Sequence, residues 1–387
     1  MVRRPGAPRP PVIPPSTLPD GYRTGFGEEP GYLDYARIGP LSAAAHAESL
    51  LHTELLTRAR FGSLDHLRTQ AARAQQSVAR IIGFRPDQVV SQPGTTSGLM
   101  QAVFGLTGEL LLSPAGAPSL PVAAVRAEDS LHVVTPRWLT TDHGRVTPGQ
   151  IREQISPSTV AVAVCLVDPR TGFRVDLDGI RQVIGDRLLI VDAAQGFGVV
   201  DAAYEVADVV ASGGRTWARA GDGTGFLALS DRALNRLVPV FSGFGGSEDD
   251  PWDVVTPPRT GAGAFCVRNS DALADARFAA ALEEIDGVGV AGIENAVTDN
   301  VTQVIDLADE YAVPVASSRD ERQRAGIIVL QPPHEQLTVL RAALSNHGVT
   351  CSTLGRTVRL SVHAQLAADT VDMLRGAFTS YATAARY

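Results

Sequence analysis

Residues 188–196 read LLIVDAAQG, a run of four large apolar side chains that ends in the acidic Asp192. An apolar run without polar alternation is typical of a strand that is buried on both faces, as in a parallel sheet covered by helices. A carboxylate at the end of a buried strand is costly unless it meets a cationic partner. The stretch therefore predicts an α/β fold with a functional group at the carboxyl edge of its sheet. On this motif alone, a simple helix cap by Asp192 stays open as the alternative.

The same alternation of short apolar runs and helical stretches continues along most of the chain. Strand-like runs lie at residues 89–90, 110–112, 160–167, 188–191, 209–211 and 225–229. Helical patterns cover 43–82 and about 261–309, and a smaller α+β pattern follows, with strands near 326–330 and 357–362 and helices at 334–347 and 367–379. This order predicts a mainly parallel sheet between helices. We expect a proline-rich arm (1–25), a large domain (26–260) and a small C-terminal domain (261–387).

The composition narrows the possible partners. The chain has 387 residues, of which 44% are hydrophobic and 20% charged, and its formal net charge is −8. No stretch is basic enough to follow a nucleic-acid backbone, and no apolar run approaches the roughly 20 residues that span a bilayer. The first residues include two arginines but no apolar run, so no signal peptide is expected. Three isolated cysteines and eight histidines show no metal-ligand spacing. We therefore expect a cytoplasmic protein without nucleic-acid, membrane or metal partners.

One feature of the composition is unusual: all 34 basic residues are arginine, and the chain contains no lysine. A bias of codon usage toward Arg, Ala, Gly and Pro explains part of this. It does not ordinarily remove a lysine that a reaction needs.

Two further loops at predicted strand ends carry chemistry. The strand at 160–167 ends in DPRTG, which places Asp168 at the same edge as Asp192, although DPRTG is also simply a good turn. The segment that includes Thr95 and Thr96 reads GTTSG and opens a predicted helix. Free backbone N–H groups, hydroxyls and the positive end of the helix dipole suit a phosphate there. An ordinary capped helix is the alternative.

The DAAQ motif resembles the D-x-A-Q or D-x-A-H element of the class V aminotransferase family of pyridoxal-phosphate (PLP) fold type I, which includes cysteine desulfurases, kynureninases and isopenicillin N epimerases. The resemblance implies a mixed, mostly parallel seven-stranded sheet with a smaller α+β C-terminal domain. It places Asp192 on the pyridinium nitrogen of PLP and Gln195 on the ring's phenolic oxygen. Asp168 matches a position near that oxygen, and Thr95 and Thr96 match the phosphate cup.

The stretch that begins at residue 208 reads DVVASGGRTWARAGDGTGFL. It is similar to the epimerase-type pattern in which His-Lys-Trp precedes a GTGFL sequence. An ungapped alignment places Arg215 at the histidine and Thr216 at the Schiff-base lysine, while Ser212 and Thr224 fall among the cofactor-binding positions. A rival register, matched to a desulfurase SGHK element, places Arg215 at the lysine. Neither side chain forms an imine, because threonine has no amine and arginine stays protonated.

Substrate-binding residues are implied at both ends of the chain. The stretch 357–363, TVRLSVH, resembles the family strand whose arginine grips the substrate α-carboxylate. This assigns Arg359 and His363 to the substrate, with Arg356, just before the strand, as the alternative arginine. Residues 31–40, GYLDYARIGP, match the segment that lines the substrate pocket and add Arg37. The family also implies a homodimer with the active site at its interface, where the Gly223–Gly225 loop reaches the neighbour's phosphate.

The chain departs from the family pattern in three ways: the lysine is missing, Arg215 replaces the preceding histidine, and the loop 113–119 offers no aromatic ring to stack on the cofactor. Three interpretations stay open. The protein has naturally diverged, using PLP or a PLP–amino acid adduct for altered chemistry in specialised biosynthesis. Alternatively, it is an engineered lysine-to-threonine variant of an ordinary enzyme, or a non-catalytic paralogue that acts as a binding or partner protein. C–S lysis, epimerisation and transamination all remain possible reactions on an amino acid or amino-acid conjugate.

Overall fold

The computed structural model describes residues 18–62, 65–243, 259–267 and 271–384. Its larger part is built on a seven-stranded sheet in the order β1-β7-β6-β5-β4-β2-β3, in which β7 runs antiparallel to both neighbours and the other pairs are parallel. The strands are β1 (Val89–Ser91), β2 (Gly108–Leu112), β3 (Val134–Trp138), β4 (Thr159–Cys165), β5 (Leu188–Asp192), β6 (Val209–Gly213) and β7 (Gly225–Leu229). The predicted mixed, mostly parallel seven-stranded sheet is confirmed.

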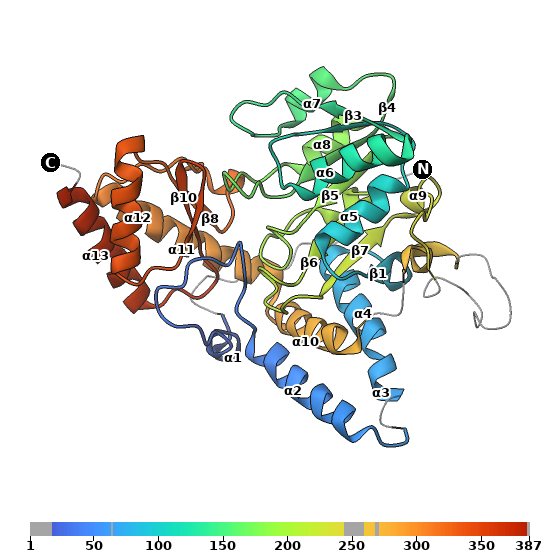
Figure 1. Ribbon diagram of the computed structural model, residues 1–387, viewed down its shortest axis with the longest axis horizontal. Helices are drawn as coiled ribbons and strands as arrows, with labels where there is room; N and C mark the ends of the chain where they lie inside the picture. The colour runs from blue at the N-terminus through green and yellow to red at the C-terminus, as the bar shows by residue number, and fades with distance from the viewer. Residues whose placement is uncertain (1–17, 63–64, 244–258, 268–270, 385–387) are drawn as a thin grey trace, which may run out of the picture.

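The sheet lies between two apolar cores (Figure 1). Alternate residues of β5 enter opposite cores, with Leu189 and Val191 on one side and Leu188 and Ile190 on the other. On the second face lie α5 (Thr95–Phe104) and α6 (Ser119–Arg126), and on the first lie α7 (Pro148–Gln154) and α8 (Leu177–Ile184). Burial on both faces explains why β5 reads as a continuous apolar run.

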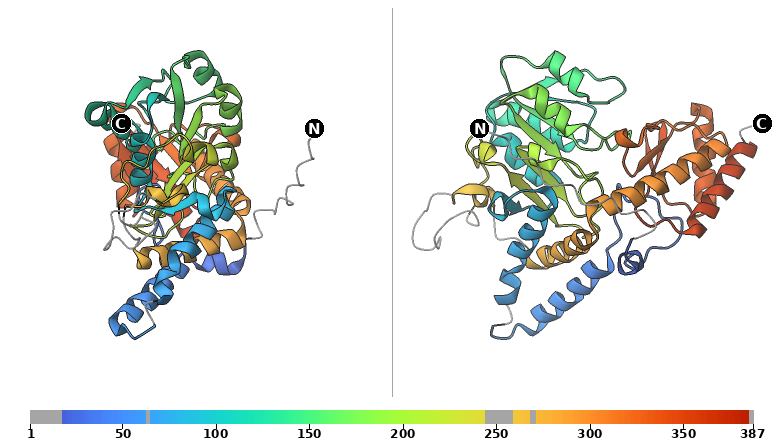
Figure 2. Two further views of the ribbon diagram at one scale, coloured as in Figure 1. Left: turned by 90° about the vertical axis from the view of Figure 1, so that its right-hand side faces the viewer. Right: turned by 180° about the vertical axis from the view of Figure 1, so that it is seen from behind.

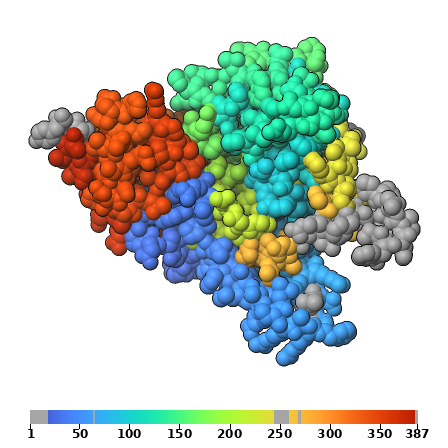
Figure 3. Space-filling model, in the orientation of Figure 1, coloured from blue at the N-terminus to red at the C-terminus, as the bar shows by residue number. Residues whose placement is uncertain are grey.

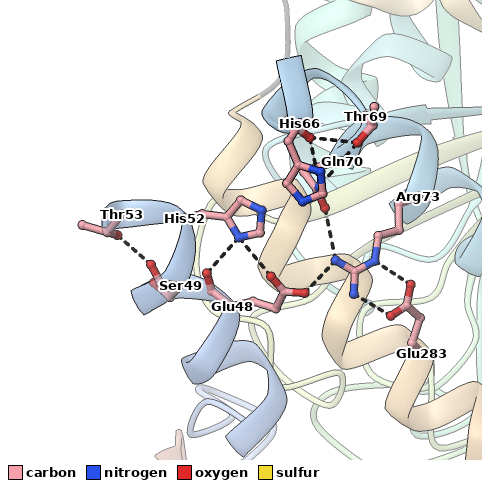
Figure 4. A network of polar contacts seen from close by, with 9 residues as sticks. All are labelled: Glu48, Ser49, His52, Thr53, His66, Thr69, Gln70, Arg73 and Glu283. Atoms are coloured by element: carbon pink, nitrogen blue, oxygen red, sulfur yellow. Dashed lines mark hydrogen bonds and ion pairs between the residues drawn. The ribbon is translucent and has the colours of Figure 1, made fainter. Parts of the chain in front are cut away.

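The predicted helical region 43–82 consists of α2 (Ala43–Arg58), the short α3 (Asp65–Arg68) and α4 (Gln70–Ile82). Both longer helices pack against α10 (Ala272–Val288). Figure 4 shows the polar contacts at this junction, where Arg73 of α4 reaches Glu48 of α2 at 2.7 Å and Glu283 of α10 at 2.6 Å. Helix α10 therefore packs on helices of the large domain, although the sequence interpretation began the small domain at residue 261.

The C-terminal part contains α11 (Val290–Glu310), β8 (Ile327–Leu330), α12 (Leu337–Asn346), β9 (Ser352–Leu354), β10 (Thr357–Ser361) and α13 (Ala368–Ala384). Its antiparallel sheet has the order β8-β10-β9. Seen from behind, α11 runs from the end of α10 into this unit (Figure 2, right).

The N-terminal segment joins the two parts of the molecule. After α1 (Asp20–Thr24), Tyr32 and Asp34 form parallel bridges to Thr350 and Ser361 of the C-terminal part. The chain then enters α2, so the segment lies between the C-terminal part and the large domain (Figure 3). Within the described ranges, no helix has the length and apolar character that crossing a membrane requires.

Candidate functional site

The candidate site lies around Asp192, the last residue of β5. Its side chain is 2% exposed, and its Oδ1 accepts a hydrogen bond of 3.0 Å from the Ala194 N–H. The other oxygen, Oδ2, is buried without a hydrogen-bond partner. Burial raises the pKa of Asp192 to about 6, although the hydrogen bond from Ala194 acts to lower it. A buried acceptor without a donor is costly, so the site is complementary to a cationic N–H group at this point.

The neighbouring strand β4 and the turn that follows it contribute two more groups. Asp168 is buried, and its Oδ1 accepts the N–H groups of Arg170 at 2.7 Å and Thr171 at 2.9 Å, while burial raises its pKa. Cys165 pairs in register with Asp192, and its Sγ accepts a 3.3 Å hydrogen bond from the Ala117 N–H. Burial raises the pKa of the Cys165 thiol. The thiol therefore stays protonated and accepts a hydrogen bond from the loop 113–119.

Helix α5 begins at the end of β6, the strand that pairs with β5. No side chain caps its first turn, and Gly94 at its N-cap approaches Gly225 so closely that a Cβ on Gly225 would lie 2.8 Å from the Gly94 Cα. The Thr96 hydroxyl lies 2.9 Å from that of Ser119. Thr95 lies against Gly213 at the end of β6. An uncapped helix N-terminus lined by hydroxyls suits a phosphate group.

The loop after β6 carries the position predicted to replace lysine. The Thr216 hydroxyl donates a 3.0 Å hydrogen bond to the carbonyl of Ala194. The Arg215 side chain is 48% exposed and lies 3.4 Å from Asp222. The hydroxyls of Ser212 and Thr224 are both buried and bond to carbonyls within the loop, at 3.3 Å and 2.6 Å. Thr216 thereby contacts the DAAQ turn.

Gln195 and His363 are engaged by the protein itself. The Gln195 amide donates to the Ala36 carbonyl at 3.0 Å and accepts from the Trp217 indole at 2.8 Å. His363 is fully buried, with Nε2 at 3.0 Å from the Trp217 carbonyl and Nδ1 accepting the Ala364 N–H, and burial lowers its pKa to about 3. Both ring nitrogens of His363 are therefore engaged by backbone groups, and its contact with a substrate stays a prediction. The predicted contact of Gln195 with a cofactor oxygen gains no support from this placement.

Arg359 reaches the site from β10 of the C-terminal part. It is buried and donates to the Pro169 carbonyl at 3.2 Å and to the Ser352 hydroxyl at 3.4 Å, and its guanidinium lies 3.7 Å from Asp34. Its Nε is buried without a partner. Arg37 lies 3.7 Å from the other oxygen of Asp34 and is 64% exposed. The predicted carboxylate-binding arginine is thus placed against the turn that carries Asp168, with one donor free.

Sequence reasoning missed Arg219, three residues after Thr216. It is 3% exposed, lies 3.8 Å above the centre of the Phe26 ring and donates to the carbonyls of Gly25 and Pro40, both at 3.0 Å. Glu28 is its carboxylate partner at 3.3 Å. The one signal in the sequence was an arginine between two alanines in a glycine-rich loop, which does not reveal partners almost 200 residues away.

The sheet order, the acidic strand end and the uncapped helix together define PLP fold type I. The family model for class-V aminotransferases matches residues 48–386, so the chain belongs to this family. The uncharacterized aminotransferase YcbU of Bacillus subtilis is 24% identical over 302 residues, which cover 75% of this chain and 78% of YcbU.

Solved structures share the fold. The apo cysteine desulfurase of Thermococcus onnurineus NA1 matches with a TM-score of 0.82 and 19% identity, covering 93% of this chain and 97% of its own. A lysine-to-alanine mutant of C-DES, with glycine covalently linked to its PLP cofactor, matches with a TM-score of 0.84 and 17% identity, covering 95% of this chain and 99% of its own.

The residues present fit PLP at both of its ends. The free Oδ2 of Asp192 matches a protonated pyridine nitrogen, and the uncapped first turn of α5 matches a phosphate. Thr216, the position predicted to replace the lysine, contacts the same turn as Asp192 through the Ala194 carbonyl.

Proposed function

We propose that this protein is an enzyme that binds a PLP-type cofactor without a covalent bond and acts on a small amino acid or an amino-acid conjugate. The observation that carries the proposal is the buried, unpartnered Oδ2 of Asp192 at the carboxyl edge of the sheet. A buried polar atom without a partner is costly, and a ligand group that donates a hydrogen bond to it removes that cost.

In this proposal, Asp192 holds the pyridinium nitrogen, and Thr95 and Thr96 with the first turn of α5 hold the phosphate. The bound cofactor supplies an electron sink for carbanion chemistry. Asp168 lies at the same edge, where burial raises its pKa and favours its protonated form. Gln195 acts indirectly, because it ties the loop that carries Thr216 to the N-terminal segment.

The substrate carboxylate binds to Arg359. The free Nε of this arginine offers a donor, while Asp34 and Ser352 hold the guanidinium in place. Thr216 neither forms an imine nor carries a proton from carbon, so the steps that lysine performs in the family must fall to the substrate or to water. The mutant C-DES supports this view, since a protein of this fold that lost a lysine holds glycine on its PLP.

The desulfurase and cystine C–S lyase neighbours favour C–S chemistry over epimerisation or transamination as the first reaction to test. A homodimer, in which the Gly223–Gly225 loop reaches the neighbour's phosphate, is part of the proposal. The absence of lysine equally favours a second candidate, a non-catalytic binding protein that retains the pocket.

The test is an absorption titration with PLP, alone and with candidate amino acids, on the natural protein, Thr216→Lys and Asp192→Asn. We expect the natural protein to bind PLP without an imine band and Thr216→Lys to gain that band. Asp192→Asn should weaken binding at least tenfold. If neither the natural protein nor Thr216→Lys binds PLP, the proposal is wrong. Binding without turnover of any amino acid by the natural protein would favour the non-catalytic candidate.

A further inference from the structure

The loop that in the family presents an amine presents oxygen atoms in this chain. Thr216 uses its hydroxyl hydrogen to bond the Ala194 carbonyl at 3.0 Å, which leaves lone pairs on the hydroxyl oxygen and on the carbonyl. Thr216 and Ala194 are both partly exposed, so this pair of oxygens is not sealed inside the core. Such a place accepts hydrogen bonds from an ammonium group, directly or across one water.

The charges around this loop also favour a cation. Asp168 and Asp192 are both buried at the neighbouring strand ends, and burial raises the pKa of each. Their ionised forms are stabilised by a nearby positive charge. Arg170 supplies part of it to Asp168 and acts to lower the pKa of that residue, whereas the pKa of Asp192 is shifted by burial and one backbone hydrogen bond. Arg215 is half-exposed and lies at Asp222 instead. No lysine is available anywhere in the chain.

We propose that the Thr216 and Ala194 oxygens receive the amino group of an aminated cofactor, so that the site selects pyridoxamine 5′-phosphate over PLP. The aldehyde of PLP supplies neither the positive charge nor the N–H donors, and it finds no lysine with which to form a covalent bond. In the family, a lysine of the protein supplies the amine at this place. In this chain, the ligand supplies it. This inference rests on the proposed function, since it assigns the form of cofactor that the same pocket takes.

Equilibrium binding of three ligands to the natural protein, followed by calorimetry, tests the inference. Pyridoxine 5′-phosphate is the matched control, because it has a hydroxyl in place of the amine and no aldehyde. We expect pyridoxamine phosphate to bind at least about tenfold more tightly than either other ligand, as one charge-assisted hydrogen bond allows. Thr216→Val, which keeps the shape and removes the hydroxyl, should reduce this preference severalfold, because the hydroxyl of pyridoxine phosphate loses one neutral hydrogen bond whereas the ammonium group loses a stronger, charge-assisted one.

Thr216→Lys should reverse the preference, since PLP then gains a covalent bond while the new ammonium group repels the ligand's amine. Equal or tighter binding of PLP by the natural protein would overturn the inference and leave the proposed function standing. An unchanged preference in Thr216→Val would also overturn the role of this oxygen. If none of the three ligands binds, the proposed function itself fails. Thermal unfolding of each variant establishes that it is folded.

Discussion

The two sides of the candidate site differ in how completely their polar groups are satisfied. On the side of the loop after β6, Arg219 bonds to two carbonyls, a carboxylate and an aromatic face. Gln195 and His363 have all their principal polar atoms engaged as well. On the side of the strand ends, one oxygen of Asp192 and the Nε of Arg359 are buried without partners.

The difference separates the groups that shape the site from the groups that await a ligand. A satisfied network is rigid and fixes the position of its loop, whereas unsatisfied buried groups cost stability until something binds them. Substitutions in the first set should therefore destabilise the protein. Substitutions of Asp192 should stabilise the unliganded protein and harm binding.

The largest effect is expected from Arg219→Ala. The substitution removes a buried cation and leaves Glu28, which also receives the Tyr35 hydroxyl, without its positive partner. Breaking a buried pair on one side costs about 3–5 kcal/mol of unfolding free energy. Urea denaturation measures it, with Arg277→Ala as the control. Arg277 donates to the Ala220 and Asp222 carbonyls of the same loop from a partly exposed position, and its loss should cost about 1 kcal/mol. Equal losses would show that Arg219 has no special role.

Gly39→Ala should disturb the loop after β6 through a steric clash alone, because it removes no polar group. Gly39 donates its N–H to the Arg215 carbonyl at 2.8 Å, and a Cβ on it would lie 1.8 Å from the Thr216 carbonyl oxygen. The clash must displace the loop, at a cost of about 1–3 kcal/mol. Gly27→Ala is the matched control, since nothing lies within 4 Å of its added Cβ, and should change stability by less than about 0.5 kcal/mol. A tolerated Gly39→Ala would mean that the loop position is not fixed by this contact.

Asp192→Asn should have the opposite effect and raise the free energy of unfolding of the unliganded protein. The folded pKa of about 6 lies above the ordinary 3.8, so ionisation destabilises the fold, beginning as the pH rises past about 4 and reaching its full extent above pH 6. The variant should therefore gain about 1–3 kcal/mol at pH 8 and nothing near pH 4. Asp168→Asn is the comparison, because its Oδ1 already accepts two N–H groups. Denaturation across this pH range measures both, and a loss of stability in Asp192→Asn at pH 8 would contradict the contrast drawn above.

Much of the fold could be predicted from the sequence because burial on both faces leaves a direct mark, as in the apolar run of β5. The edge strand β3 escaped prediction, since it contains Pro136 and is exposed along much of its five residues. The strand β9 was missed for a similar reason, because it has three residues and two of them are exposed.

The acidic strand ends were predictable because Asp168 and Asp192 follow apolar runs directly. The true partners of Gln195 and His363 were not, because each bonds to segments distant in the sequence, at Ala36 and Trp217. A motif names a residue type at a position, whereas its partners depend on which loops the fold brings together.

Substitution of Arg37 should give the smallest change in stability, because this residue is mostly exposed to solvent. It is 64% exposed and lies 3.7 Å from Asp34, a geometry that contributes about 0–1 kcal/mol to stability. Arg37→Ala should therefore leave denaturation nearly unchanged. If Arg37 assists Arg359 in binding a substrate carboxylate, the affinity of the cofactor-loaded protein for an amino acid should fall a few fold. The fall should disappear at about 1 M salt, where exposed charges are screened beyond about 3 Å. A large loss of stability would instead place Arg37 with the satisfied residues of the loop side.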